Sequence, residues 1–155
     1  MELATGSAVP CLRLQGEREA WNVPRAGPQA LFFFKVSCPT CPLAAPAVER
    51  LRAAYPGIEV IAVAQDDLAT SREWLARFGL AAPIALEGES YPASNAFNLV
   101  TVPTLVLVDG AGKIAAVQEG WSRKGYDELA SKAALLVGAP PVPIAPDSGP
   151  VWKPG

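Results

Sequence analysis

The sequence predicts an α/β protein in which a central mixed β-sheet is flanked by helices. Strand-sized apolar segments alternate with segments of helical periodicity, a pattern typical of parallel strands joined by helices. Two further strand candidates flank the turn Asp109-Gly110-Ala111-Gly112, which predicts an antiparallel hairpin and makes the sheet mixed. The chain has 155 residues, of which half are hydrophobic and 18% charged, as expected for one soluble domain with its own core.

Six segments are rich in apolar and β-branched residues and short enough to be strands. In chain order they are 9–14, 30–36, 58–64, 83–86, 104–108 and 113–119. The first is an edge strand or an extended lead-in. By contrast, ALFFFKV at 30–36 and IEVIAVA at 58–64 are apolar enough to be buried on both faces of the sheet.

Four segments are expected to be helical: 42–55, 70–78, 91–99 and 126–137. In the first of them, apolar residues recur at helical spacing on one face, namely Leu43, Ala47, Leu51 and Ala54. Pro56-Gly57 ends that helix, and Gly79 is the expected C-terminal cap of the second helix.

The chain changes character at Gly138. Six of the 18 residues from there to Gly155 are proline, which favours extended chain over helix or strand. We therefore divide the chain into a domain over residues 1–138 and a proline-rich tail over 139–155. Because prolines cannot supply regular backbone pairing, we expect the tail to be dispensable for folding, with Trp152 the one residue suited to docking it.

The composition excludes several classes of function. The net charge is −2 and no long run of like charge occurs, so neither a nucleic-acid nor a membrane-surface footprint is predicted. No segment approaches the roughly 20 apolar residues of a membrane-spanning helix. The start, MELATGSAVP, lacks the features of a secretory signal, so we expect a cytoplasmic protein unless an export signal has been removed. We also expect a monomer.

Cys38 and Cys41 form a C-x-x-C pair that follows a buried strand and opens a helix. The first sulfur of such a pair lies where unpaired helix N–H groups and the positive end of the helix dipole favour an anion. This lowers the pKa of the thiol and supplies a nucleophilic thiolate. The second sulfur is one turn away, so Cys38 would attack a disulfide and Cys41 would resolve the mixed disulfide. We expect Cys38 to be the exposed thiol and Cys41 the buried one.

The alternative interpretations of this pair are half of a zinc site or two inert cysteines. Zinc needs four ligands, and the chain adds only Cys11 and contains no histidine, so we expect neither a metal nor another cofactor. The absence of histidine also excludes Ser–His and Cys–His catalysis. Cys11 has no cysteine near it in sequence and is interpreted as a small buried hydrophobe rather than a third redox thiol.

FFFKVSCPTCPLAAP, followed by a distant Val102-Pro103-Thr104, resembles the thioredoxin superfamily, specifically its TlpA/redoxin branch, which is related to AhpC/TSA proteins. The resemblance extends from about residue 9 to residue 137, and Pro46 matches the helix-kinking proline of these proteins. It implies a thioredoxin-like fold, with a helix-plus-strand insertion over 67–99. It also implies a cis Pro103 facing the cysteines, and substrate contacts by Val102, Pro103, Pro39 and Thr40.

The sequence departs from this family at positions that tune the chemistry. Ser37 replaces the usual aromatic residue before the first cysteine, and the proline follows that cysteine as Pro39. The two positions where relatives carry an acid are Phe32 and Ala44. Without an acid or a histidine, we expect Cys41 to lose its proton slowly at neutral pH.

Three polar residues near the cysteines have simple explanations. Lys35 is interpreted as an exposed residue at a strand end, although its charge could favour a thiolate. Asp66 and Asp67 are interpreted as a solvated loop and a helix cap.

The favoured function is therefore disulfide exchange with protein or small-molecule thiols by a thiol–disulfide oxidoreductase. Two alternatives remain: a peroxiredoxin-like thiol peroxidase, and a redox-silent binding module on the same fold. Peroxidase chemistry resembles P-x-x-x-[ST]-x-x-C, which fits neither cysteine. The two required positions are Leu31 and Lys35 for Cys38, and Phe34 and Cys38 for Cys41.

Overall fold

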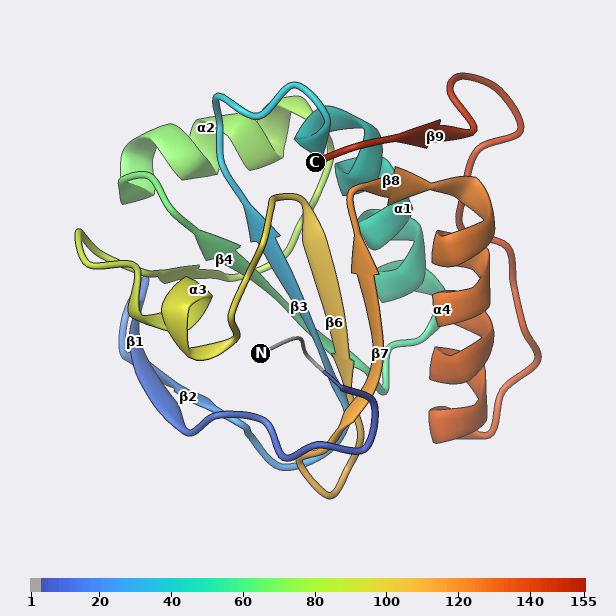
Figure 1. The fold of residues 1–155 in the computed structure, drawn as a ribbon, viewed down its shortest axis with the longest axis horizontal. Coiled ribbons are helices and arrows are strands. Elements are labelled where there is room, and N and C mark those ends of the chain that lie inside the picture. Colours follow the sequence, from blue (N-terminus) through green and yellow to red (C-terminus); the bar gives the residue numbers. More distant parts are fainter. Residues whose placement is uncertain (1–3) are drawn as a thin grey trace.

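A mixed seven-stranded sheet forms the centre of the computed structural model, which describes residues 4–155 (Figure 1). Its strands are β1 (Leu12–Gly16), β2 (Ala20–Val23), β3 (Gln29–Phe34), β4 (Glu59–Ala64), β5 (Ile84–Leu86), β6 (Thr104–Val108) and β7 (Ile114–Glu119). Their order across the sheet is β2-β1-β5-β4-β3-β6-β7. Strands β3, β4 and β5 are parallel, whereas β6 runs antiparallel to β3, and β7 antiparallel to β6.

Four helices cover the sheet: α1 (Cys41–Ala54), α2 (Leu68–Arg77), α3 (Pro92–Ala96) and α4 (Arg123–Val137). All six residues of β3 are buried, because both faces of this strand are covered. Phe32 and Phe34 pack with α1, α2 and α4, and the Phe34 ring lies 4.8 Å from that of Trp74. Phe33 points to the other face and packs against Phe97, just after α3, at 5.3 Å.

The predicted mixed α/β fold is confirmed, including the segment α2–β5–α3 inserted between the central strands β4 and β6. Each expected strand and helix is present, with ends that differ by a few residues; the lead-in expected at 9–14 becomes β1, at 12–16. Strand β2 was not expected, and it forms a hairpin with β1. Within residues 4–155, no helix is both long and apolar enough to cross a membrane.

The proline-rich tail is anchored to the domain at residues 140–145. Ile144 is fully buried in the core that α1 and α4 share, and its N–H donates to Asp127 Oδ1 at 2.8 Å. Arg50 donates to the Ile144 carbonyl oxygen at 2.9 Å, and Tyr55 Oη accepts from Val142 N at 2.7 Å. We therefore no longer expect the tail to be dispensable for folding, and expect residues 140–145 to stabilise the fold.

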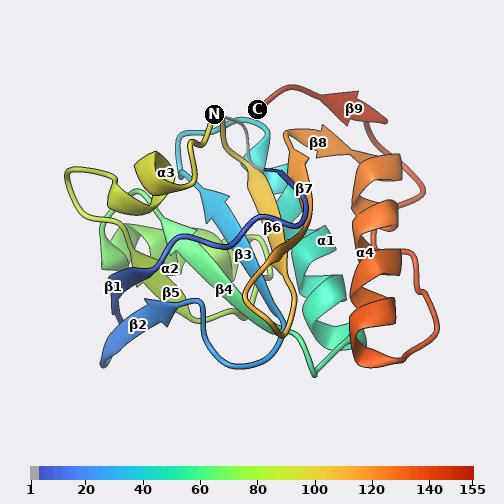
Figure 2. The ribbon, with the colours of Figure 1, turned by 60° about the horizontal axis from the view of Figure 1, so that its bottom comes forward.

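Beyond its anchor, the tail returns over the domain and ends in a second, two-stranded sheet. Strand β9 (Trp152–Lys153) pairs antiparallel with β8 (Trp121–Ser122), and Figures 1 and 2 show β9 passing above the start of α1. Trp152 is 64% exposed, so its backbone, rather than its side chain, attaches this part of the tail. The division into a domain over 1–138 and a tail over 139–155 stays a prediction.

Candidate active site

The two cysteines lie in the loop between β3 and α1, where the chain leaves the sheet and enters the helix. A turn in this loop places the Cys38 N–H 3.1 Å from the Lys35 carbonyl oxygen. The loop is fixed to the neighbouring strand, because Val36 N donates to the Asp66 carboxylate just after β4 at 2.9 Å. The carboxylate of Asp66 thus positions the segment that carries Cys38.

The sulfur of Cys38 occupies the place of a helix cap. Helix α1 begins at Cys41, and the Cys41 N–H donates to Cys38 Sγ at 3.0 Å. Thr40 is the N-cap residue, but its side chain makes no capping hydrogen bond. A negative charge on Cys38 Sγ would therefore be stabilised by a free N–H of the first helical turn and by the helix dipole.

Both thiols are shielded from solvent. Cys38 is 8% exposed and Cys41 is fully buried. The expectation of an exposed Cys38 was wrong, because the loop at Val102 contacts this thiol, and Gly155 in the tail lies against the same loop. Burial raises the pKa of the Cys41 thiol far above its ordinary value, and its hydrogen bond with Cys38 and the charge of that residue raise it further.

The loop before β6 faces the cysteines. The Val102–Pro103 peptide bond is cis, and Cys38 Sγ donates to the Val102 carbonyl oxygen at 3.4 Å. Pro103 is buried, and its carbonyl oxygen accepts from Gly120 N at 2.8 Å, which ties the loop to the end of β7. Of the four residues expected to contact substrate, Val102 touches Cys38 directly, while Thr40 is buried and Pro39 exposed between the cysteines.

The two positions at which relatives carry an acid are occupied here by apolar residues, Phe32 in β3 and Ala44 in α1, and both are fully buried.

Tyr126 in α4 also lies near the thiol pair. Its hydroxyl is buried and finds no hydrogen-bond partner among residues 4–155. Burial raises the pKa of Tyr126, as do the charges of Cys41 and Cys38, so this phenol lies within electrostatic reach of both thiols. Sequence reasoning placed it only at the start of a helix.

The other candidates fall outside the thiol pair. Cys11 is exposed, which corrects its interpretation as a buried hydrophobe; it lies in the surface lead-in to β1. Lys35 is half-buried at the end of β3. Asp67 caps α2 as expected, because its side chain accepts a hydrogen bond from Thr70 N at 2.8 Å. Asp66 was expected in a solvated loop, but its carboxylate accepts a hydrogen bond from Val36 N.

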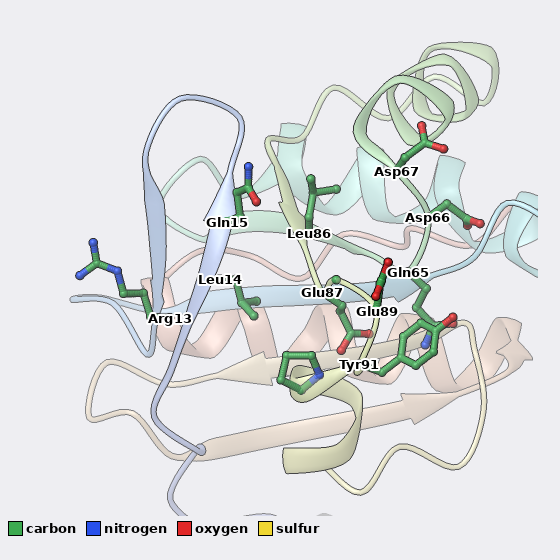
Figure 3. A pocket seen from close by; sticks show the side chains of 12 residues that line it. Arg13, Leu14, Gln15, Gln65, Asp66, Asp67, Leu86, Glu87, Glu89 and Tyr91 are labelled. Carbon is green, nitrogen blue, oxygen red and sulfur yellow. The ribbon is translucent and has the colours of Figure 1, made fainter.

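Asp66 is one of the residues that line a pocket between β1, β5 and the start of α2 (Figure 3). Glu87 and Tyr91 line it together with Gln65. The Glu87 carboxylate is buried and satisfied, because it accepts from the N–H of Ser94 at 2.6 Å and from the Ser94 hydroxyl. Neither Cys38 nor Cys41 lines this pocket, so it is separate from the thiol site.

The fold and the thiol pair together define a thioredoxin-like redox protein. Residues 16–117 match the model of the AhpC/TSA family, and the chain belongs to that family. A comparison with curated protein sequences found no match.

Several solved structures share the fold at low sequence identity. A Chlorobium tepidum protein, provisionally assigned as the thiol:disulfide interchange protein DsbE, superposes with a TM-score of 0.79 and 20% identity over 88% of this chain and 100% of that one. For a thiol:disulfide interchange protein from Bacteroides sp. the values are 0.74, 20%, 90% and 93%. For the thioredoxin domain of a thiol-disulfide oxidoreductase from Bacteroides vulgatus they are 0.72, 18%, 83% and 96%.

Proposed function

We propose that this protein is a thiol–disulfide oxidoreductase in which Cys38 is the attacking thiol and Cys41 the resolving thiol. The observation that carries the proposal is the contact between the Cys41 N–H and Cys38 Sγ at the first turn of α1. It places Cys38 Sγ at the N-terminus of a helix, where the helix dipole stabilises an anion, whereas burial raises the pKa of Cys41. The names of the similar structures, which include interchange proteins and oxidoreductases, support the same class of reaction.

The reaction has two exchange steps. The Cys38 thiolate attacks one sulfur of a substrate disulfide, forms a mixed disulfide and releases the other substrate sulfur as a thiolate, which takes a proton from water. Cys41 then loses its proton and attacks Cys38 Sγ, which releases the second substrate thiol. Two electrons pass to the substrate, and the protein ends with a Cys38–Cys41 disulfide. The reverse sequence would oxidise a dithiol.

The loop at Val102 supports a role in holding the substrate. Its carbonyl oxygen is 3.4 Å from Cys38 Sγ, so a chain bonded to that sulfur would lie beside the Val102 backbone. Pro39 and Thr40 follow Cys38 directly in the chain, and we propose that they contact the substrate as well. We propose protein or small-molecule thiols and disulfides as partners. The cytoplasmic location and the monomeric state stay predictions of the sequence.

An insulin-reduction assay beside a peroxide-consumption assay tests the proposal. We expect the protein to reduce insulin with dithiothreitol as electron donor, Cys38→Ser to abolish this activity, and Cys11→Ser, a matched change at the exposed third cysteine, to preserve it. Peroxide consumption without insulin reduction would replace the proposal by a thiol peroxidase. No turnover in either assay would leave a binding module.

A further inference from the structure

The end of the tail, at Pro154 and Gly155, lies between the cysteine loop and the loop at Val102. The Pro154 carbonyl oxygen accepts a hydrogen bond of 2.7 Å from the hydroxyl of Thr40, which is the residue between Pro39 and Cys41. The tail therefore contacts the cysteine loop itself, and Figures 1 and 2 both place the C-terminal end beside the start of α1.

Because its hydroxyl contacts the tail, Thr40 does not cap helix α1 with its side chain. A threonine at an N-cap usually accepts a hydrogen bond from the N–H two or three residues later. Here the Thr40 hydroxyl donates to the tail instead, and the side chain caps nothing. The first turn of α1 is thus arranged to bind an extended backbone.

Gly155 reaches the loop at Val102. A Cβ added to Gly155 would overlap the Thr101 side chain and come within 2.6 Å of the Val102 carbonyl oxygen, the atom that contacts Cys38 Sγ. Gly120 also lies close to the tail, since a Cβ there would come within 2.8 Å of the Lys153 carbonyl oxygen. Pro154 and Gly155 therefore fill the space between the cysteine loop and the cis-proline loop.

Residues 149–155 are held mainly by backbone hydrogen bonds rather than by buried apolar side chains. Trp152, Lys153, Pro154 and Gly155 are all exposed, so almost no apolar burial retains them. The hydrogen bonds of residues 152–155 are the β8–β9 pairing and the Thr40 bond, each of modest net strength because water replaces it when it breaks. The carbonyl oxygens of residues 149–151 accept further hydrogen bonds from the Trp121 indole and from the backbone and side chain of Arg123. Ile144 stays buried at the other end, so a released segment remains tethered near the site at high effective concentration.

We infer that residues 149–155 are an autoinhibitory segment that occupies the substrate site of the thiol pair. The inference rests on the proposed function. A protein disulfide reaches Cys38 only by displacing this segment and taking over its backbone contacts with β8, Thr40 and the loop at Val102. The segment sets the rate of the first exchange step and discriminates against substrates that offer no extended chain to replace it.

The direct test is the alkylation rate of Cys38 in the reduced protein, measured by mass spectrometry with N-ethylmaleimide. Cys11 is exposed and serves as a reference within the same molecule. A chain shortened after Val151 loses the β9 pairing and the Thr40 contact but keeps Ile144 and its neighbours. We expect the ratio of Cys38 to Cys11 labelling to rise about tenfold, which corresponds to about 1.4 kcal/mol.

A full-length variant guards against a folding defect. Gly155→Leu keeps every residue of the tail but cannot fit against Thr101, so it should raise the labelling ratio as the shortened chain does. Ser148→Leu adds the same side chain at an exposed tail position outside the segment and should leave the ratio unchanged. A blocked peptide with the sequence of residues 149–155, added to the shortened chain, should lower the ratio again.

Equal labelling ratios in the full-length, shortened and Gly155→Leu proteins would overturn the inference. Because labelling needs no turnover, its outcome is independent of the proposed function. If the shortened chain is labelled faster but never reduces insulin, the inference that residues 149–155 cover Cys38 holds and the proposed oxidoreductase activity is refuted. Equal insulin reduction and equal labelling in all three proteins would do the opposite.

Discussion

Replacing Ile144 with alanine tests whether the tail is part of the fold. The side chain is fully buried in the core between α1 and α4, although it comes from a segment with the composition of a linker. Removing a buried isoleucine side chain down to alanine costs about 2–5 kcal/mol of unfolding free energy, with the cost depending on how far the site can collapse. A tail on the surface can shift inward, so we expect the lower half of that range, about 2–3 kcal/mol.

Backbone hydrogen bonds at the same place keep the tail attached to the domain in this variant. Asp127 Oδ1 accepts from the N–H groups of Ile144 and Ala145 at 2.8 and 2.9 Å, and Arg50 binds the Ile144 carbonyl oxygen. These bonds fix the residue 144 backbone while the side chain is removed. In a chain of this length, each kcal/mol shifts the melting temperature by about 2–4 °C, so we expect a decrease of about 4–12 °C.

Urea unfolding followed by tryptophan fluorescence, together with calorimetry, measures this change. Val142→Ala is the matched control, because Val142 lies two residues earlier in the tail and is 45% exposed. It should change the unfolding free energy by less than about 0.5 kcal/mol. A loss below about 0.5 kcal/mol for Ile144→Ala as well would mean that the tail does not pack into the core, and the anchored tail would have to be abandoned.

The remaining predictions concern the second exchange step and the cysteine loop. In the mixed disulfide the charge of Cys38 is gone but the burial of Cys41 persists, so the pKa of Cys41 stays raised. The rate at which a model substrate is released, followed by stopped flow, should therefore rise about tenfold per pH unit. A rate that is flat between about pH 6 and 8 would mean that another group takes the proton. Ala44→Glu should speed release near neutral pH and flatten this profile, and an unchanged profile would argue against a missing acid. Cys41→Ser should accumulate the mixed disulfide at Cys38, visible by intact mass, and the absence of this adduct would reverse the roles of the two thiols. Asp66→Ala should cost about 1–3 kcal/mol in urea unfolding, because Val36 N loses a charged acceptor, whereas no loss would show that the loop is held elsewhere.

The sequence predicts those parts of the molecule whose signal is local. Strand β6 (Thr104–Val108) has the predicted bounds, because an apolar β-branched run ends at a glycine-containing turn. Helix α1 follows from its proline at the first turn and its apolar face. The cysteine pair and the cis Val102–Pro103 bond are marked by short motifs, so the order of residues alone locates both.

What the sequence does not predict depends on contacts between distant segments. Strands β8 and β9 have two residues each, and only their mutual pairing makes them strands. Ile144 is a lone apolar residue among prolines, and its burial requires the groove between α1 and α4. The exposure of Cys38 was misjudged for the same reason, since the residues that cover it lie 64 and more positions away in the chain.

Coverage of Cys38 by the tail and burial of Cys41 affect different steps of the reaction, so their effects can be measured separately. Displacing residues 149–155 changes access to Cys38, so it alters the second-order rate constant of the first exchange and depends on the size and shape of the disulfide. The burial of Cys41 raises the pKa of the proton that must leave before resolution, so it alters a first-order rate and depends on pH. A shortened chain should accordingly react faster with protein disulfides while keeping the pH profile of resolution. Ala44→Glu should shift that profile while keeping the labelling rate of Cys38. If either change moved both quantities, the tail and the resolving thiol would be coupled, and Tyr126, buried within electrostatic reach of both thiols, would be the residue through which to trace that coupling.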